Sequence, residues 1–318
     1  MQASLNNQRA STHQSEFLAS IGNTPLFRLR NITRGLPSGV ELHVKAEHLN
    51  PGGSVKDRAA LAMILHGEQT GDLVPGKIIL DATSGNTGIA YAMIAACLGY
   101  GVALCLPANA SYERKNILRA YGAEIFETDP AESTDGAQAL ARQLAASEPD
   151  KYFYPDQYNN DANWQAHYEH TGPEILNQTS GRITHFVAGL GTTGTFVGVA
   201  RRLKKYNSNI NVIAVQPDSP LHGLEGMKHL KSAIMPGIYD PALPDNIMEV
   251  STDDAFDIAA KLGREEGLLV GPSSGANVSA ALNLAKQLPS GSVVVTILCD
   301  RGERYFSHTF RKEHLNND

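Results

Sequence analysis

Cysteine and positive charge are both scarce in this chain of 318 residues. It has only three cysteines and no CxxC pair, so it cannot form a disulfide framework, which favours a reducing compartment such as the cytoplasm. The 27 lysines and arginines are outnumbered by 33 acidic residues, which gives a net charge of −6. The chain therefore lacks the overall basic character of most nucleic-acid-binding proteins, and we expect no nucleic-acid partner.

Long apolar segments are missing as well. No run approaches the length of a membrane span, and residues 1–15 lack the apolar core of a secretory signal, so we expect no membrane partner. We interpret the polar residues at both ends, including 311–318, as a loose lead-in and a frayed end. The pair His167 and His170 predicts an exposed helix face rather than a metal site, and no metal is expected.

What the chain does contain is an alternation of strands and helices. Strand-like runs are followed by loops rich in Gly, Ser and Thr and then by amphipathic helix patterns, one of which, residues 252–266, ends at Gly267. This order predicts parallel sheets covered by helices on both faces. The length favours two domains, and the polar stretch 156–163 is a candidate crossing point between them. The strand-like runs are 41–47, 78–80, 102–106, 184–188, 211–215 and 293–299.

Two loops could hold a phosphate group, residues 83–88 and 189–195. Each is rich in Gly and Thr and precedes a predicted helix, whose free N–H groups and dipole attract anions. The second loop is a literal G-x-G-x-x-G, and Asp218 lies roughly 20 residues further on, as in a dinucleotide site. A single motif of this kind is weak evidence for NAD, and the glycines could also serve only to tighten a turn.

The most informative stretch is residues 50–58, NPGGSVKDR. Ser54 and Asp57 have the spacing of a capping box, so Lys56 is predicted in the first turn of a helix. The helix dipole disfavours a positive charge there, which favours a nucleophilic amine. A surface lysine would be the simpler interpretation of Lys56 alone. Together with two loops that could hold phosphate, it indicates a cofactor with an aldehyde and a phosphate, which is pyridoxal 5′-phosphate (PLP).

The sequence resembles the cysteine synthase (O-acetylserine sulfhydrylase) family of fold-type II PLP enzymes. The resemblance runs from residues 21–26 (IGNTPL) to about residue 307. Between these points the chain contains NPGGSVKDR, TSGNTG, GLGTTGT and GPSSGA in the family's order. It implies an α/β fold of two domains, each a mainly parallel twisted sheet flanked by helices, with PLP in the cleft between them. The expected division is a smaller domain of residues 48–160 and a larger one of residues 1–47 and 161–318. A homodimer is also expected.

The resemblance assigns roles to individual residues. Lys56 matches the Schiff-base lysine, Asn86 the hydrogen-bond partner of the cofactor's 3′-oxygen, and Ser273 the residue facing the pyridine nitrogen. A neutral hydroxyl at that nitrogen favours β-elimination over transamination. Many relatives have Gly where Thr193 stands. The phosphate loop is expected to be Gly191, Thr192, Thr193, Gly194 and Thr195, and the substrate-carboxylate pocket Thr83, Ser84, Asn86, Thr87 and Gln157. Ser84 and Gln157 could instead only cap a helix or bond the backbone.

The implied reaction is β-replacement on O-acetyl-L-serine. The Lys56 amine takes the Cα proton, acetate leaves, and a sulfur nucleophile adds at Cβ to give L-cysteine. The substrate loop after Thr83 would close over the substrate. The B-type isozyme is the most similar, because residues 299–305 read CDRGERY. Cys299 and Asp300 replace small hydroxyl residues of the A-type, and Lys228 stands where relatives place an arginine. These three residues are candidate contacts for thiosulfate as a second donor, although Lys228 and Lys231 could simply be a solvated face.

Other activities remain possible at this point. The same fold serves O-phosphoserine sulfhydrylases, cystathionine β-synthases and serine dehydratases. The haem segment and regulatory module of cystathionine β-synthase have no room in this chain, and dehydratases typically have His where Thr87 stands. A PLP-binding homologue without activity is disfavoured because Lys56 is intact.

Overall fold

The computed structural model describes residues 16–83 and 85–306 of the chain. The described residues form two compact units. One consists of residues 16–23, 50–52 and 56–157, and the other of residues 24–49, 53–55 and 158–306. The chain therefore alternates between the two units within residues 49–56, the stretch that leads to Lys56. The units differ from the predicted division mainly in residues 16–23 and 53–55 and in the crossing point, which lies between Gln157 and Tyr158.

The smaller unit is built on a four-stranded parallel sheet in the order β5-β4-β3-β6. Its strands are β3 (Ile78–Ala82), β4 (Gly101–Pro107), β5 (Glu124–Thr128) and β6 (Tyr152–Phe153). Its helices are α2 (Lys56–Thr70), α3 (Asn86–Leu98), α4 (Tyr112–Ala120) and α5 (Ser133–Ser147), with a short 3-10 turn η2 (Pro130–Glu132) before α5.

Residues of β3 and β4 alternate between the two faces of this sheet. One set packs with α5 and comprises Leu80, Ala82, Ala103 and Cys105 with Ala137 and Ala141. The opposite face is covered by α3, because Leu104 approaches Gly88 and the carboxyl of Asp81 bonds Tyr91. An ionisable residue on that face is unusual for a strand whose other members are apolar.

The larger unit is built on a six-stranded sheet in the order β1-β2-β10-β7-β8-β9, in which only β1 is antiparallel to its neighbour. Its strands are β1 (Leu26–Arg28), β2 (Glu41–Lys45), β7 (His185–Gly189), β8 (Asn211–Pro217), β9 (Asn246–Val250) and β10 (Val293–Ile297). Its helices are η1 (Glu47–Leu49), α6 (Asp161–Ala166), the π-helical η3 (His167–Thr171), α7 (Gly172–Gln178), α8 (Gly194–Tyr206), α9 (Thr252–Glu266), α10 (Pro272–Ala285) and η4 (Gly302–Tyr305).

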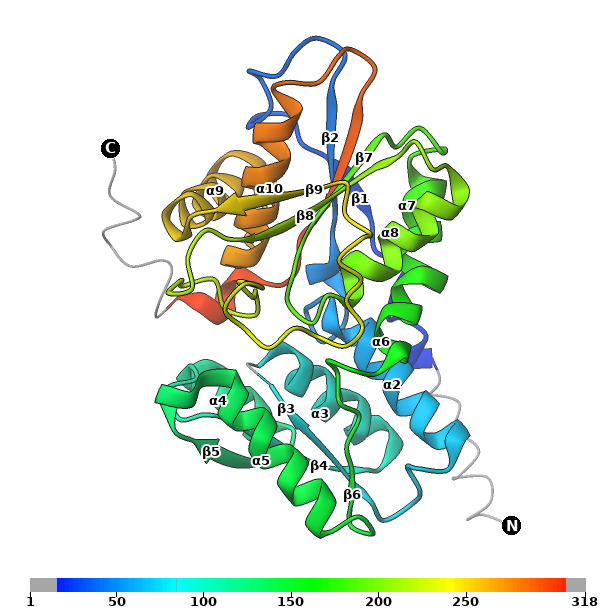
Figure 1. Ribbon diagram of the computed structural model, residues 1–318, viewed down its shortest axis with the longest axis vertical. Helices are drawn as coiled ribbons and strands as arrows, with labels where there is room; N and C mark the ends of the chain where they lie inside the picture. Colours follow the sequence, from blue (N-terminus) through cyan, green and yellow to red (C-terminus); the bar gives the residue numbers. More distant parts are fainter. Residues whose placement is uncertain (1–15, 84, 307–318) are drawn as a thin grey trace. The chain divides into compact units, whose positions relative to one another are not determined.

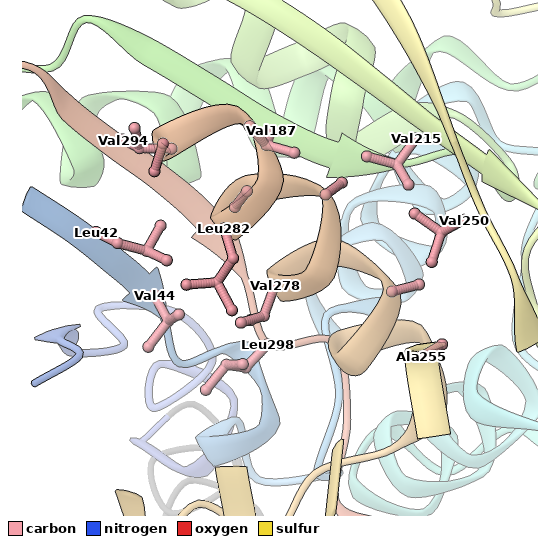
Figure 2. Packing of buried hydrophobic residues seen from close by; sticks show 14 of the residues in the cluster. Leu42, Val44, Val187, Val215, Val250, Ala255, Val278, Leu282, Val294 and Leu298 are labelled. Carbon is pink, nitrogen blue, oxygen red and sulfur yellow. The ribbon is translucent and has the colours of Figure 1, made fainter. Parts of the chain in front are cut away.

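Helices cover both faces of the six-stranded sheet (Figure 1). In β7, Val187 belongs to the cluster beneath α9 and α10, whereas its neighbours Phe186 and Ala188 belong to the cluster beneath α8. Figure 2 shows Val278 and Leu282 of α10 lying over the first face of this sheet. Burial on both faces explains why the central strands read as continuous apolar runs.

The predicted fold class, two α/β regions with mainly parallel sheets, is confirmed. Each predicted strand run overlaps an observed strand, and α9 ends at Gly267, whose φ of 70° gives a left-handed cap. Among the described residues, no helix is both long enough and apolar enough to cross a membrane. Residues 1–15 and 311–318, predicted to be loose ends, lie outside the described residues.

Candidate active site

Lys56 is the first residue of α2, and the three residues before it bond the segment that follows β10. The Val55 N–H donates to the carbonyl oxygen of Cys299 at 2.8 Å, and Ser54 forms an antiparallel bridge with Asp300. Asp300 is fully buried and accepts a hydrogen bond from the hydroxyl of Tyr305. Hydrogen bonds therefore hold the backbone of the residues that immediately precede Lys56.

The acidic residue of the predicted capping box does bond the backbone ahead of α2. The carboxylate of Asp57, which is fully buried, accepts the N–H of Gly52 at 2.6 Å. A carboxylate in the first turn also interacts favourably with the helix dipole. Asp57 thus ties the start of α2 to the NPGG segment, and the side chain of Lys56 lies half-buried beside it in the same turn.

The predicted substrate loop connects β3 to α3. Gly85 caps α3 with a φ of 138°, a conformation that favours glycine, and a Cβ there would collide with the side chain of Arg114. The Thr83 hydroxyl accepts the N–H groups of Gly85 at 3.0 Å and Gly88 at 3.2 Å. Asn86 is the first residue of α3 and is half-buried. Ser84 lies outside the described residues.

Gln157 joins this loop from a distant part of the sequence. Its Nε2 donates to the carbonyl of Ala82 at 2.5 Å, and its Oε1 accepts from the hydroxyl of Thr87 at 2.8 Å. The structure therefore brings three predicted pocket residues, Thr83, Thr87 and Gln157, together at the carboxyl end of β3. The same contacts show that Gln157 does bond the backbone, which the sequence left open.

A buried carboxyl group lies directly beneath the loop. Asp81 is fully buried, accepts the Ala82 N–H at 2.7 Å, and accepts the Tyr91 hydroxyl at 2.9 Å. Burial raises the pKa of this carboxyl from its usual value to about 7, against the lowering effect of these hydrogen bonds. Burial likewise raises the pKa of Tyr91 well above its usual value, so its hydroxyl stays neutral.

The second predicted loop connects β7 to α8. A Cβ on Gly191 would collide with the carbonyl oxygen of Gly226, so only glycine fits there. Thr193 caps α8 with a φ of 73°, a strained conformation for a β-branched residue. Its hydroxyl oxygen is buried and has no hydrogen-bond partner among the residues that the structure describes. A buried, unsatisfied hydroxyl at a helix N-terminus fits the oxygen atoms of a bound phosphate.

Neighbouring threonines of this loop have partners. The Thr192 hydroxyl accepts Asn163 Nδ2 at 3.1 Å, and the Thr195 hydroxyl lies 3.2 Å from His167 Nε2. His167 also contacts the hydroxyl of Thr171 at 2.9 Å. The expectation that His167 lies on an exposed helix face is wrong, because the π-helical turn packs it against α8 and leaves it 1% exposed. Among the described residues, no group of three potential metal ligands is found.

Two adjacent serines at the start of α10 have different environments. The hydroxyl of Ser274 is buried and accepts the N–H of Cys299 at 2.8 Å. Ser273, the predicted partner of the pyridine nitrogen, is half-buried in the first turn of the helix. The Ser274 hydroxyl therefore supports the segment that follows β10. A contact between Ser273 and the pyridine nitrogen stays a prediction.

The basic residues ahead of Met235 also differ from one another. Lys228 is 8% exposed, its N–H donates to the carbonyl of Leu190 at 2.7 Å, and its Nζ lies 5.0 Å from the ring centre of Tyr158. Lys231 has a 75% exposed side chain and lies 3.5 Å from Glu249. Lys231 thus fits a solvated face, whereas Lys228 is packed beside Leu190, the residue that precedes the phosphate loop.

A family model described as pyridoxal-phosphate dependent enzyme matches residues 18–300. The chain belongs to this family. It is similar to the cysteine synthase of Aquifex aeolicus (strain VF5), with 51% identity over 294 residues that cover 91% of this chain and 90% of the relative. Cysteine synthase B of Salmonella typhimurium is 46% identical over 93% of this chain and 96% of the relative. The crystal structure of Entamoeba histolytica cysteine synthase superposes with a TM-score of 0.88 at 35% identity, covering 93% and 90% of the two chains.

The resemblance to the cysteine synthases and the prediction of PLP are thereby confirmed. The residues present fit the cofactor of this PLP-dependent family. The unsatisfied Thr193 hydroxyl and the close approach at Gly191 suit a phosphate, and Lys56 at the start of α2 carries the amine that the cofactor's aldehyde requires. When bound, PLP supplies an aldehyde for an amino group and an electron sink for charge at Cα.

Sequence reasoning missed residues that hold the predicted ones in place. Asn163 supports Thr192, His167 supports Thr195, and Ser274 supports the segment at Cys299. Asp81 supports the substrate loop. The signal for Asp81 was visible, since an acidic residue inside the apolar run of β3 needs partners. The other supporting contacts join segments far apart in the sequence, which no local pattern reveals.

Proposed function

We propose that the protein is a cysteine synthase, an O-acetylserine (thiol)-lyase that replaces the acetoxy group of O-acetyl-L-serine with sulfide. The products are L-cysteine and acetate. Relatives with this name match more than 90% of the chain at 46–51% identity. The observation in the structure that carries the proposal is the buried, unsatisfied Thr193 hydroxyl at the start of α8, because it calls for a phosphate ligand.

The protein's own groups divide the work as follows. Thr83, Thr87 and Gln157, which interlock at the end of β3, bind and orient the substrate carboxylate. The Lys56 amine, which would hold the cofactor's aldehyde in the resting protein, accepts the Cα proton of the substrate. The Cβ–O bond breaks and acetate leaves, a sulfur–carbon bond then forms at Cβ, and Lys56 returns the proton to Cα. Closure of the substrate loop excludes water during these steps.

Two side chains orient the cofactor in this scheme. Asn86, at the first position of α3, would donate a hydrogen bond to the 3′-oxygen of bound PLP. Ser273 would offer the pyridine nitrogen a neutral hydroxyl, which favours loss of a leaving group from Cβ over transamination. Gly191, Thr192, Thr193, Gly194 and Thr195 form the phosphate site.

The experiment uses the purified holoenzyme with O-acetyl-L-serine and sulfide. We expect L-cysteine and acetate in equal amounts, with O-phospho-L-serine a poorer substrate. Reduction with borohydride followed by peptide mass spectrometry should place the pyridoxyl group on Lys56. The assignment of O-acetylserine fails if O-phosphoserine is turned over faster, and the assignment of Lys56 fails if the label lies on another lysine.

Thiosulfate is a second candidate donor, favoured by the position of Lys228. A dianion entering a protein needs a cation to offset its lost hydration, and Lys228 is a packed cation next to the phosphate loop. The buried position of Asp300 and its contacts with Ser54 and Tyr305 give it a supporting role. A direct contact of Asp300 or of the half-buried Cys299 with the donor stays a prediction.

The test of this donor is formation of S-sulfocysteine from O-acetyl-L-serine and thiosulfate. Lys228→Ala should raise the KM for thiosulfate and weaken its salt dependence, whereas the exposed control Lys231→Ala should change neither. If the wild-type protein forms no S-sulfocysteine, thiosulfate is not a donor. If Lys228→Ala behaves like the control, another residue binds the dianion.

We further propose a cytoplasmic homodimer that has no nucleic-acid or membrane partner. The three cysteines, Cys97, Cys105 and Cys299, form no disulfide, which suits a reducing compartment. The homodimer rests on the family resemblance. Light scattering on a sizing column should give a mass of about twice 34.2 kDa, and a monomer at micromolar concentration would contradict it.

A further inference from the structure

Asp81 makes more contacts than its place in an apolar strand requires. Its carboxyl accepts the N–H of Ala82 at 2.7 Å and the hydroxyl of Tyr91 at 2.9 Å. The backbone N–H of Gln157 is a third donor to the same group. These donors come from three segments, the end of β3, the helix α3 and the chain after β6. One buried carboxyl therefore joins all three.

Each of these segments carries a residue of the proposed carboxylate pocket. Thr83 follows Ala82 directly, and Thr87 lies one turn before Tyr91 on α3. Gln157 itself bonds both Thr87 and the Ala82 carbonyl through its side chain. Asp81 thus forms three hydrogen bonds, and each one holds a segment that carries a pocket side chain.

The groups facing Asp81 leave its charge unneutralised. Burial raises the pKa values of Tyr91 and Tyr154 well above the usual range and that of Cys105 to about 12, so these groups stay neutral near pH 7. Asp156 is an acidic neighbour that further disfavours ionisation of Asp81. The thioether of Met63 on α2 contacts the Tyr91 hydroxyl and carries no charge. None of these described groups supplies a cation.

We propose that Asp81 is a positioning residue that sets the geometry and the charge of the substrate-carboxylate pocket through Ala82, Tyr91 and Gln157. This inference rests on the proposed function of that pocket. A neutral Asp81 keeps the three segments joined without opposing an incoming carboxylate. An ionised Asp81 places a second negative charge beneath the pocket, and like charges in a low-dielectric interior repel.

The consequence is a pH dependence of substrate binding that originates outside the pocket. As pH rises through about 7, the pKa of the buried Asp81 carboxyl, binding of the substrate carboxylate should weaken. Asn at position 81 has nearly the same shape, can accept the Ala82 N–H, and can donate to the Tyr91 hydroxyl. It represents the neutral state at every pH.

The experiment measures KM for O-acetyl-L-serine and kcat at saturating sulfide between pH 6 and 8 with the holoenzyme. For the wild type we expect KM to rise about fivefold across this range, the lower end of couplings between sites. Asp81→Asn should keep the low KM throughout with kcat changed less than about twofold. Tyr91→Phe should raise KM at every pH, because the bond between α3 and the carboxyl is lost.

The matched control is Tyr100→Phe, which removes a phenol hydrogen bond to Glu68 at 2.8 Å in the same unit but away from the loop. It should leave both constants unchanged. The inference is overturned if folded Asp81→Asn retains the wild-type pH dependence of KM. Should Asp81→Asn fail to fold, a wild-type KM in Tyr91→Phe overturns it instead. If the wild type does not convert O-acetylserine at all, the proposed function fails first, so the two failures are distinguishable.

Discussion

Replacing Thr193 by Gly should have opposite effects on the stability of the protein without its cofactor and on its affinity for PLP. Thr193 combines a φ of 73° with a buried hydroxyl that finds no partner in the described part of the chain. A non-glycine residue in this region costs about 1–3 kcal/mol, and an unsatisfied buried hydroxyl costs about 1–3 kcal/mol more. Glycine removes both costs but loses about 0.5–1 kcal/mol through its extra backbone entropy.

We therefore expect Thr193→Gly to stabilise the cofactor-free protein by about 1–5 kcal/mol, the balance of these contributions. A hydroxyl that bonds a charged phosphate is worth about 1.5–3 kcal/mol, so the dissociation constant for PLP should rise about ten- to hundredfold. Urea unfolding of the cofactor-free protein and absorbance titration with PLP measure the two effects separately.

Two further substitutions separate strain from hydrogen bonding. Thr193→Ser keeps the hydroxyl and removes the β-branch, so it should retain most of the PLP affinity. Thr193→Val keeps the branched shape and should lose affinity without gaining stability from relief of the φ strain. PLP binding by Thr193→Gly as tight as in the wild type would refute the assignment of this hydroxyl to the phosphate. A loss of stability in the cofactor-free Thr193→Gly protein would refute the argument from strain.

Three other predictions concern the two units separately. Burial raises the native pKa of Asp81 from 3.8 to about 7, so the native state keeps this proton to a higher pH than the unfolded state does. The contribution of this proton to the unfolding free energy is therefore complete below about pH 4 and is lost as pH rises through 7. The unfolding free energy of Asp81→Asn, relative to that of the wild type, should therefore increase by about 4 kcal/mol between pH 4 and pH 8. Hydrogen exchange in β3 and α3 measures this quantity, and a difference between the two proteins that does not change with pH would contradict the prediction. Lys45 is fully buried, and its Nζ lies 2.6 Å from the Glu174 carboxylate. Lys45→Met should therefore lower the unfolding free energy by about 3–5 kcal/mol. The exposed control Lys231→Met should lower it by less than about 1 kcal/mol. Asn86→Ala should keep PLP but slow turnover by about 1–3 kcal/mol of barrier, and an unchanged rate would leave Asn86 with a structural role only.

The parts of the fold that sequence reasoning found are those with a local signal. The central strands are buried on both faces and therefore read as apolar runs, as in β10, where all five residues are buried. The strands β5 and β9 were missed because most of their side chains are exposed or half-buried, which leaves no apolar run. The edge strands of a sheet lack the pattern by which its centre is recognised.

The site shows the same distinction. The glycine and threonine loops were visible as motifs, and Lys56 was placed at a helix start, as observed. The left-handed conformation of Thr193 was not predictable, because a residue with positive φ is usually glycine and rarely a β-branched residue such as threonine. The burial of His167 was also missed, since it depends on how η3 packs against α8 and not on the spacing of histidines.

The most direct test of the central claim is the rate of L-cysteine formation from O-acetyl-L-serine and sulfide by Lys56→Ala. The proposal makes this amine both the anchor of PLP and the group that moves the Cα proton. We therefore predict a fall in rate of at least about 10³-fold, while Lys151→Ala, which removes an exposed lysine paired with Glu148, keeps the wild-type rate. Cysteine formation by Lys56→Ala within tenfold of the wild type would contradict the account.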